Sequence, residues 1–153
     1  MSCEIDYFPE LTAVVHQAIG SYLNADNDTL MSMMTEDILF ELPYALPDGP
    51  SHISGKAALG DYLPKIAQLI SIASMSLENA VVGEGGQQAV LEISCQGTGI
   101  ATGRRYDQHY VCVLTLRNGF IKRWRDYWNP LVMLQAVGGA GDISQIMKGV
   151  KDD

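Results

Sequence analysis

The second half of the chain constrains the fold most, because it has the pattern of long strands joined by short turns. Strands are expected at residues 74–82, 87–102, 104–116 and 120–129. The Gly-rich stretch 83–86 marks one turn, Gly103 a break, and Asn118-Gly119 is a strong hairpin signal. Strands connected this closely pair as an antiparallel meander. Two glycines inside the second strand, Gly97 and Gly99, favour a sharp bend there.

Helical patterns come before these strands. Apolar residues recur at helical spacing over 11–23, and a second short helix is expected over 30–34, with Asp28 as its cap. A short strand at 38–42, a Pro-rich loop at 43–54 and a third helix after Gly55 follow, and Pro64 predicts a kink or a restart. A further short helix is expected at 131–137. This order predicts an α+β fold. Three N-terminal helices would pack on one face of a strongly bent, mostly antiparallel sheet and enclose an apolar, cone-shaped pocket.

Length and composition set the broad class. The 153 residues fit one domain, expected over 1–137, with a tail at 138–153 that carries a weak helical pattern at 142–150. A net charge of −8 with 10 Lys+Arg argues against nucleic acid as a partner. No uncharged apolar run is long enough to span a membrane, and the acidic N-terminus lacks a secretory pattern, so we expect a cytoplasmic protein. Cys3, Cys95 and Cys112 form neither a disulfide framework nor a zinc-binding spacing.

Asp126, on the last predicted strand, is the main candidate for chemistry. Strand alternation puts it on one face with Phe120, Lys122, Trp124 and Trp128. A carboxyl group between two indole rings loses hydration, which raises its pKa towards the range useful for general acid or base catalysis. The other interpretation is a surface aspartate paired with an arginine at 105, 123 or 125.

The pairing of the last two strands decides which residues face Asp126. A two-residue Asn118-Gly119 turn sets Val111 opposite Asp126, whereas a three-residue loop sets Tyr110 there. The first alternative lines the pocket with Asp107, His109, Val111 and Val113. The second lines it with Tyr106, Gln108, Tyr110, Cys112 and Leu114. We prefer the second because that set is the more apolar one, and a slip of one residue exchanges the two faces.

Three stretches together resemble the nuclear transport factor 2-like superfamily over roughly residues 10 to 137. They are the run from Thr35 to Pro43 (TEDILFELP), the run from Ile53 to Leu59 (ISGKAAL) and the run from Asn118 to Pro130 (NGFIKRWRDYWNP). The last run looks like the final strand of SnoaL-like polyketide cyclases, limonene epoxide hydrolases and phenazine-biosynthesis A/B proteins. Its Asn-Pro ending is most similar to the phenazine type.

The resemblance implies a pocket-facing acid at Asp126 that works without metal or organic cofactor. Tyr62 falls where phenazine-type proteins place a pocket histidine. The ketosteroid isomerase branch would place its catalytic groups near Ala18, Leu42 and Cys112, which cannot do that chemistry. The arginine–aspartate pair of the epoxide hydrolases has no counterpart in 91–95.

Two hypotheses follow. The first is a SnoaL-like, cofactor-independent enzyme in which Asp126 performs acid–base chemistry (cyclisation, isomerisation or condensation) on a small hydrophobic cyclic or polyketide-like molecule. The expected pocket residues are Tyr62, Trp124, Trp128, Tyr110, Tyr44, Cys112, His52 and His109. The alternative is a non-catalytic small-molecule-binding or dimeric assembly domain of the same fold. A homodimer through the outer face of the sheet would use Ile121, Arg123, Arg125 and Tyr127.

Overall fold

The order of helices and strands agrees with the predicted α+β class. The computed structural model describes residues 5–24 and 28–138. Its main elements are α1 (Pro9–Ile19), β1 (Met34–Glu41), β2 (His52–Ser54), α2 (Lys56–Leu69), β3 (Ile70–Val82), β4 (Gln88–Gly99), β5 (Gln108–Arg117), β6 (Phe120–Tyr127) and α3 (Pro130–Val137). Short 3₁₀ turns lie at Gly20–Tyr22, Met31–Met33 and Glu84–Gly86. The weak helical pattern at 142–150 lies outside the described residues.

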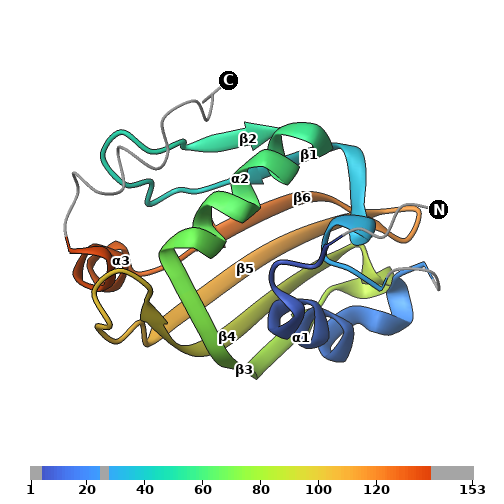
Figure 1. Cartoon of the computed structure of the whole chain (residues 1–153). Helices are drawn as coiled ribbons and strands as arrows, with labels where there is room; N and C mark the ends of the chain where they lie inside the picture. Colours follow the sequence, from blue (N-terminus) through green and yellow to red (C-terminus); the bar gives the residue numbers. More distant parts are fainter. Residues whose placement is uncertain (1–4, 25–27, 139–153) are drawn as a thin grey trace.

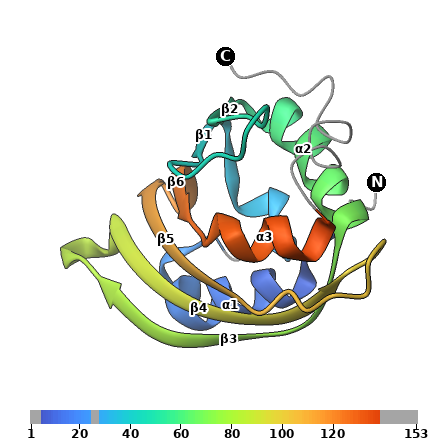
Figure 2. The same ribbon diagram turned by 90° about the vertical axis from the view of Figure 1, so that its left-hand side faces the viewer.

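The strands form one six-stranded mixed sheet in the order β2-β1-β6-β5-β4-β3. The four strands β3 to β6 make the predicted antiparallel meander, and β1 pairs with β6 in parallel. In Figure 1 α1 and α2 lie in front of the sheet. Figure 2 shows the sheet curving around α1 and α3, so that the helices lie on its concave side. Apolar side chains of that side form the core, among them Val15, Ile38, Leu91 and Met133.

The predicted second helix is wrong. The segment forms only the 3₁₀ turn Met31–Met33, and Met34 already belongs to β1. Thr29 and Ser32 explain why, since each backbone N–H donates to the other residue's hydroxyl oxygen and closes a local turn. The expectation of three N-terminal helices is therefore wrong, because the third helix, α3, follows the last strand.

The segment 43–54 and the helix after it also differ in detail from the expectation. The end of the predicted loop is the strand β2, which pairs with β1 opposite Leu39, Phe40 and Glu41. The next helix, α2, runs without interruption from Lys56 to Leu69 with Pro64 inside it, so the expected restart is wrong. The chain passes directly from α2 into β3.

Gly97 and Gly99 allow the close approach of other segments to β4. A Cβ atom at Gly97 would lie 2.5 Å from the carbonyl oxygen of Ser71, and one at Gly99 would collide with the carbonyl oxygen of Ala136 in α3. The pairing of β3 with β4 shifts by one residue between Ile72 and Ser74, opposite Gly97. The glycines therefore let β3 and α3 close tightly over this end of the sheet.

Candidate functional site

The turn between β5 and β6 has the two-residue form, so the preferred three-residue loop is wrong. Arg117 pairs with Phe120, and both Asn118 (φ 53°) and Gly119 (φ 81°) adopt the left-handed conformation that such a turn requires. Beyond the turn the pairing shifts by one residue, because Lys122 is an extra residue on β6. Cys112 consequently pairs with Asp126. Both predicted partners of Asp126, Val111 and Tyr110, are therefore wrong.

The bulge also changes which side chains of β6 point inward. Ile121 and Trp124 are both buried, whereas the two residues between them, Lys122 and Arg123, are exposed. Lys122 therefore does not share the face of Trp124, and Ile121 does not belong to the outer face. On β5 the preferred inward set holds, since Gln108, Cys112 and Leu114 are buried.

A cavity of about 60 Å³ lies between the helices and the concave face of the sheet. Its wall is almost entirely apolar and aromatic. The lining residues are Phe8, Leu11, Leu30, Phe40, Tyr62, Leu63, Ile66, Ile70, Ile72, Met75, Tyr106, Tyr110, Cys112, Trp124, Asp126 and Trp128. Asp126 is the one acidic residue among these lining residues, and no lysine, arginine or histidine stands beside it.

The carboxyl group of Asp126 sits in an environment that disfavours its charge. Burial raises the pKa of Asp126 to about 7, although a hydrogen bond from Cys112 acts in the opposite direction. The Cys112 thiol donates to Oδ1 of Asp126 across the strand pair, with Sγ and Oδ1 3.7 Å apart. The arginines of the described chain that form ion pairs use other acids, Asp107, Asp37 and Glu41. The alternative of a surface aspartate paired with an arginine does not match this geometry.

Three tyrosines add hydroxyl groups to the cavity wall. The hydroxyl oxygens of Tyr106 and Tyr110 are hydrogen-bonded at 2.7 Å. Burial raises the pKa of Tyr62, Tyr106 and Tyr110 above the usual value for a phenol, and the nearby Asp126 raises it further. All three therefore keep their protons at neutral pH and can act as hydrogen-bond donors.

A ring contact and a hydrogen bond hold the two tryptophans beside Asp126. Trp124 stacks on Phe40, with ring centroids 5.9 Å apart and an angle of 28° between the rings. The indole N–H of Trp128 donates to the backbone carbonyl of Tyr44 at 3.1 Å. The indole nitrogen of Trp124 is buried without a hydrogen-bond partner in the described part of the chain. Burial raises the pKa of the Cys112 thiol, and the same N–H acts on that thiol in the opposite direction, so it is a donor close to both Cys112 and the cavity.

Three of the predicted pocket residues lie outside the cavity. His109 points to the outer face, because β5 alternates and its even-numbered neighbours point inward. Tyr44 is 54% exposed, and its ring packs edge-on against Tyr127 at 5.5 Å. His52 lies in β2, opposite Glu41 and away from the cavity wall. Their placement in the pocket is therefore wrong, and Tyr44 contributes only its carbonyl group.

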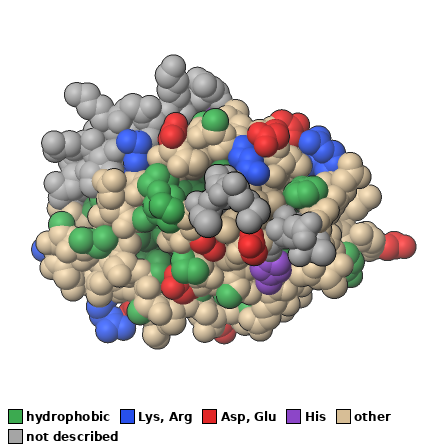
Figure 3. All heavy atoms as spheres, turned by 45° about the vertical axis from the view of Figure 1, so that its right-hand side comes forward, with side chains coloured by type: hydrophobic (Ala, Val, Ile, Leu, Met, Phe, Trp, Pro, Cys, Tyr) green, Lys and Arg blue, Asp and Glu red, His purple; other side chains and the backbone are tan. Residues whose placement is uncertain are grey.

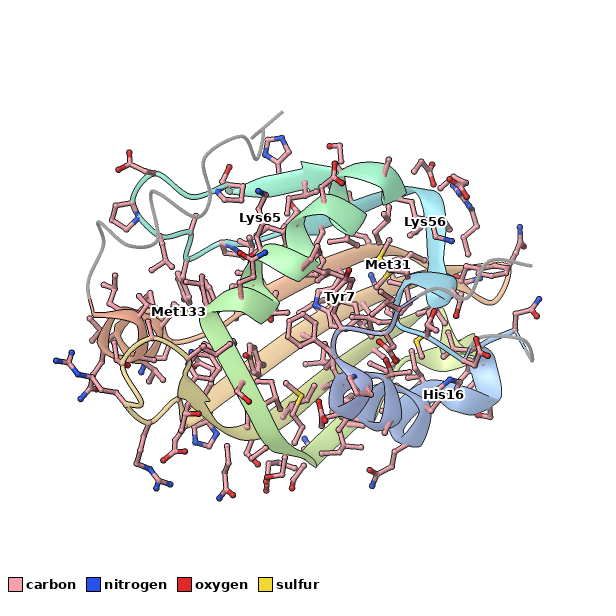
Figure 4. The ribbon with its side chains drawn as sticks, in the orientation of Figure 1. Tyr7, His16, Met31, Lys56, Lys65 and Met133 are labelled. Carbon is pink, nitrogen blue, oxygen red and sulfur yellow. The ribbon has the colours of Figure 1, made fainter. Side chains whose placement is uncertain are left out.

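Tyr106 lines the cavity, as the preferred inward set of the sequence analysis predicts. The prediction missed Phe8, Phe40 and Met75, which face the cavity only through tertiary packing. A surface groove lined by Ile5, Tyr7, Met31, Glu36, Lys56, Ala57 and Gly60 adjoins the cavity at Leu63, which lines both. Figure 4 shows Tyr7 between α1 and α2, with Met31 near the start of α2. The face drawn in Figure 3 intersperses hydrophobic side chains with acidic and basic ones.

Residues 5–24 and 28–138 contain no cluster of three or more His, Cys, Asp or Glu side chains that could hold a metal ion. None of the helices in these ranges is long and apolar enough to cross a membrane. The absence of a cofactor stays a prediction.

Comparison with known proteins places the chain in a family. The model of the SnoaL-like domain family matches residues 11–124. The uncharacterized protein YesE of Bacillus subtilis is 33% identical over 133 residues, which are 87% of this chain and 90% of that protein. The uncharacterized PhzA/B-like protein PA3332 of Pseudomonas aeruginosa is 26% identical over 111 residues, which are 72% of this chain and 78% of that protein.

A solved structure agrees with this assignment. The crystal structure of a Bacillus subtilis protein provisionally named an isomerase has 32% sequence identity and a TM-score of 0.71, and the match covers 88% of this chain and 97% of that one. The resemblance to SnoaL-like proteins noted in the sequence is confirmed. The chain belongs to the SnoaL-like domain family.

Proposed function

We propose that the protein is an enzyme that catalyses proton transfer on a small hydrophobic cyclic molecule, with Asp126 as its general acid and base. One observation carries the proposal: a carboxyl group with a pKa of about 7 lines an apolar cavity and forms no ion pair within the described chain. A group with this pKa is present in both protonation states near neutral pH, so it can accept a proton and return it. An ionisable side chain without a charged partner lowers the stability of the fold when it lies in an apolar cavity, so its presence there is typical of a functional group.

The chemistry balances without an oxidant or a reductant. The Asp126 carboxylate removes a proton from a carbon next to a carbonyl group. The electrons of the C–H bond form a C=C bond, and those of the C=O bond move to oxygen, which a tyrosine hydroxyl stabilises by donating a hydrogen bond. In a β,γ-unsaturated ketone the C=O bond then re-forms, the double bond shifts, and protonated Asp126 gives the proton to the γ carbon, which yields the conjugated isomer. In a ring closure the enolate carbon instead attacks a second carbonyl group of the same molecule, and protonated Asp126 gives its proton to the oxygen of that carbonyl group.

The family gives further support at a coarser level. A relative at 32% identity is provisionally named an isomerase, and solved structures of the same fold include a protein from Xanthomonas campestris provisionally named a polyketide cyclase. The PhzA/B-like relative has a name of a different kind, so the reaction itself is decided by experiment.

The test is proton exchange at carbon in D₂O. A panel of cyclic β,γ-unsaturated ketones with one, two and three rings would be incubated with the wild type and with Asp126→Asn, and NMR would follow deuterium uptake and double-bond migration. We expect at least one ketone of the panel to take up deuterium at least 100-fold more slowly with Asp126→Asn than with the wild type, in line with the usual contribution of a general base. Glu41→Gln, which removes an acid from the outer face, is the matched control and should keep full activity. If no ketone shows exchange that depends on Asp126, the proposal is wrong.

We also propose that the protein pairs with a second copy through the outer face of the sheet, which is the core of the alternative hypothesis. Arg123, Arg125 and Tyr127 lie on this face, and a shallow hollow beside them is lined by Tyr44, His109 and Val111. Exposed aromatic and arginine side chains are typical of interfaces. Light scattering should report a dimer that dissociates in Tyr127→Asp. A monomeric wild type would contradict this proposal.

A further inference from the structure

The polar groups of the cavity are few, and they fall into two kinds. Asp126 provides one carboxyl group, and Tyr62, Tyr106 and Tyr110 provide hydroxyl groups that stay protonated at neutral pH. The Tyr106–Tyr110 hydrogen bond uses one of its two phenol protons, so the other can bind a ligand. The unpartnered indole N–H of Trp124 is a further donor in the same wall. The wall therefore offers mainly donors, which call for acceptor oxygens on the ligand.

Among the residues that the structure describes, none with a positive charge lines the cavity to balance an anionic ligand. The two lysines of α2, Lys56 and Lys65, are not among the residues that line it (Figure 4). On the far side of β6, Arg123 and Arg125 both pair with Glu41. An anionic ligand would lose its hydration and would also lie beside the Asp126 carboxylate. Both effects disfavour binding, because a buried charge needs a partner of opposite sign.

The size of the cavity limits the ligand further. Its volume is about 60 Å³. A cavity of about 150 Å³ binds a benzene ring. The space here is therefore at the lower limit for a single six-membered ring, and fused rings exceed it. The tight packing of Trp124 on Phe40 leaves little room for expansion on that side.

From these three features we infer that the cavity binds an uncharged compound of one ring whose carbonyl oxygen accepts hydrogen bonds from the tyrosine hydroxyls. The inference rests on the proposed function for the role of Asp126 and deepens it by naming the ligand class. Carboxylate compounds and fused polycyclic compounds are excluded as preferred ligands, the first by charge and the second by volume.

Binding of three matched aromatic probes tests the inference at pH 8, where Asp126 is mostly ionised. Benzamide is uncharged with one ring, benzoate has the same ring with a negative charge, and 2-naphthamide is uncharged with two fused rings. Isothermal titration calorimetry should give benzamide a dissociation constant at least tenfold lower than that of either other probe. In Asp126→Asn the dissociation constants of benzamide and benzoate should be closer to each other, because the Asp126 carboxylate no longer repels the carboxylate of benzoate. In Tyr62→Phe benzamide should bind about twofold to tenfold more weakly, since one hydrogen bond is lost.

Each contrary outcome overturns the inference. Benzoate that binds as tightly as benzamide refutes the exclusion of anions, and 2-naphthamide that binds as tightly refutes the size limit. If none of the three probes binds at millimolar concentration, the ligand class is wrong altogether.

Failure of the inference can be told apart from failure of the proposed function. Benzamide has no removable proton on the carbon next to its carbonyl group, so its binding is measured independently of proton transfer. If benzamide binds as expected but no ketone exchanges a proton through Asp126, the ligand class stands and the catalytic role fails. If only a ketone with fused rings exchanges, the catalytic role stands and the ligand class fails.

Discussion

Ionisation of Asp126 should destabilise the folded protein, and Asp126→Asn isolates that effect. The pKa of this carboxyl group is about 7 in the folded chain against a reference of 3.8. Between these two values the folded state binds more protons than the unfolded state, so the free energy of unfolding falls as the pH rises. The amide of the variant does not titrate. The variant should therefore gain stability relative to the wild type as the pH increases.

The size of the effect follows from the two pKa values. The difference between about 7 and 3.8, at about 1.36 kcal/mol per pKa unit, gives about 4 kcal/mol for full ionisation. This is an upper limit, because the side chain is only partly buried by area. Applied to pH 5 and pH 8, the same two-state titration predicts that the stability gap changes by about 2.6 kcal/mol in favour of the variant.

Urea unfolding of both proteins at pH 5 and at pH 8 measures this change. Glu41→Gln is the control, since its partner Arg123 lowers the pKa of Glu41 and the carboxylate is charged in both states across most of this range. The difference in free energy of unfolding between Glu41→Gln and the wild type should change little between the two pH values. The reasoning about Asp126 is refuted if the corresponding difference for Asp126→Asn is the same at both pH values, or if it shifts in favour of the wild type as the pH rises.

Two further substitutions test the surroundings of the site. Cys112→Ala removes the thiol that donates to Asp126. The pKa of that carboxyl group should therefore rise by up to about one unit, as expected for the loss of one hydrogen bond. A ¹³C NMR titration measures this pKa, and the absence of a rise would contradict the prediction. Gly99→Ala places a Cβ against the carbonyl of Ala136 and should lower the free energy of unfolding by about 1–3 kcal/mol. Gly60→Ala in α2, whose Cβ would meet only the side chain of Met31 at an ordinary contact distance, should be neutral or stabilising in the same urea experiment. Equal effects at the two glycines would refute the account of close approach.

Local signals predicted those features that depend on neighbouring residues. The Asn118-Gly119 turn, the meander of β3 to β6 and the short helix after Pro130 all agree with the sequence patterns. Each depends on turn chemistry or on alternation within a few residues. The buried carboxyl group also follows from such a local pattern, because the strand that carries Asp126 alternates with two tryptophans.

Features that depend on distant partners could not be predicted. The bulge at Lys122 lies where β6 is paired with β5 on one side and with β1 on the other, and Ile121 pairs with Met34 and with Leu116. The pairing with β1 has no local signal, because the two strands are far apart in the sequence. The outward direction of His109, by contrast, agrees with the preferred inward set of β5, which contains only even-numbered residues.

The long strand β3 forms an open border of the sheet, and its irregular pairing has a consequence for solubility. An unpaired border strand invites the addition of strands from other molecules, which leads to aggregation. Register shifts divide the pairing of β3 into three stretches, which begin at Ile70, Ser74 and Asn79. Each break twists the strand and interrupts its free row of backbone donors and acceptors. An incoming chain therefore finds no long, flat template along this border, and the acid Glu78, at the second break, adds charge repulsion against a second copy of the same strand.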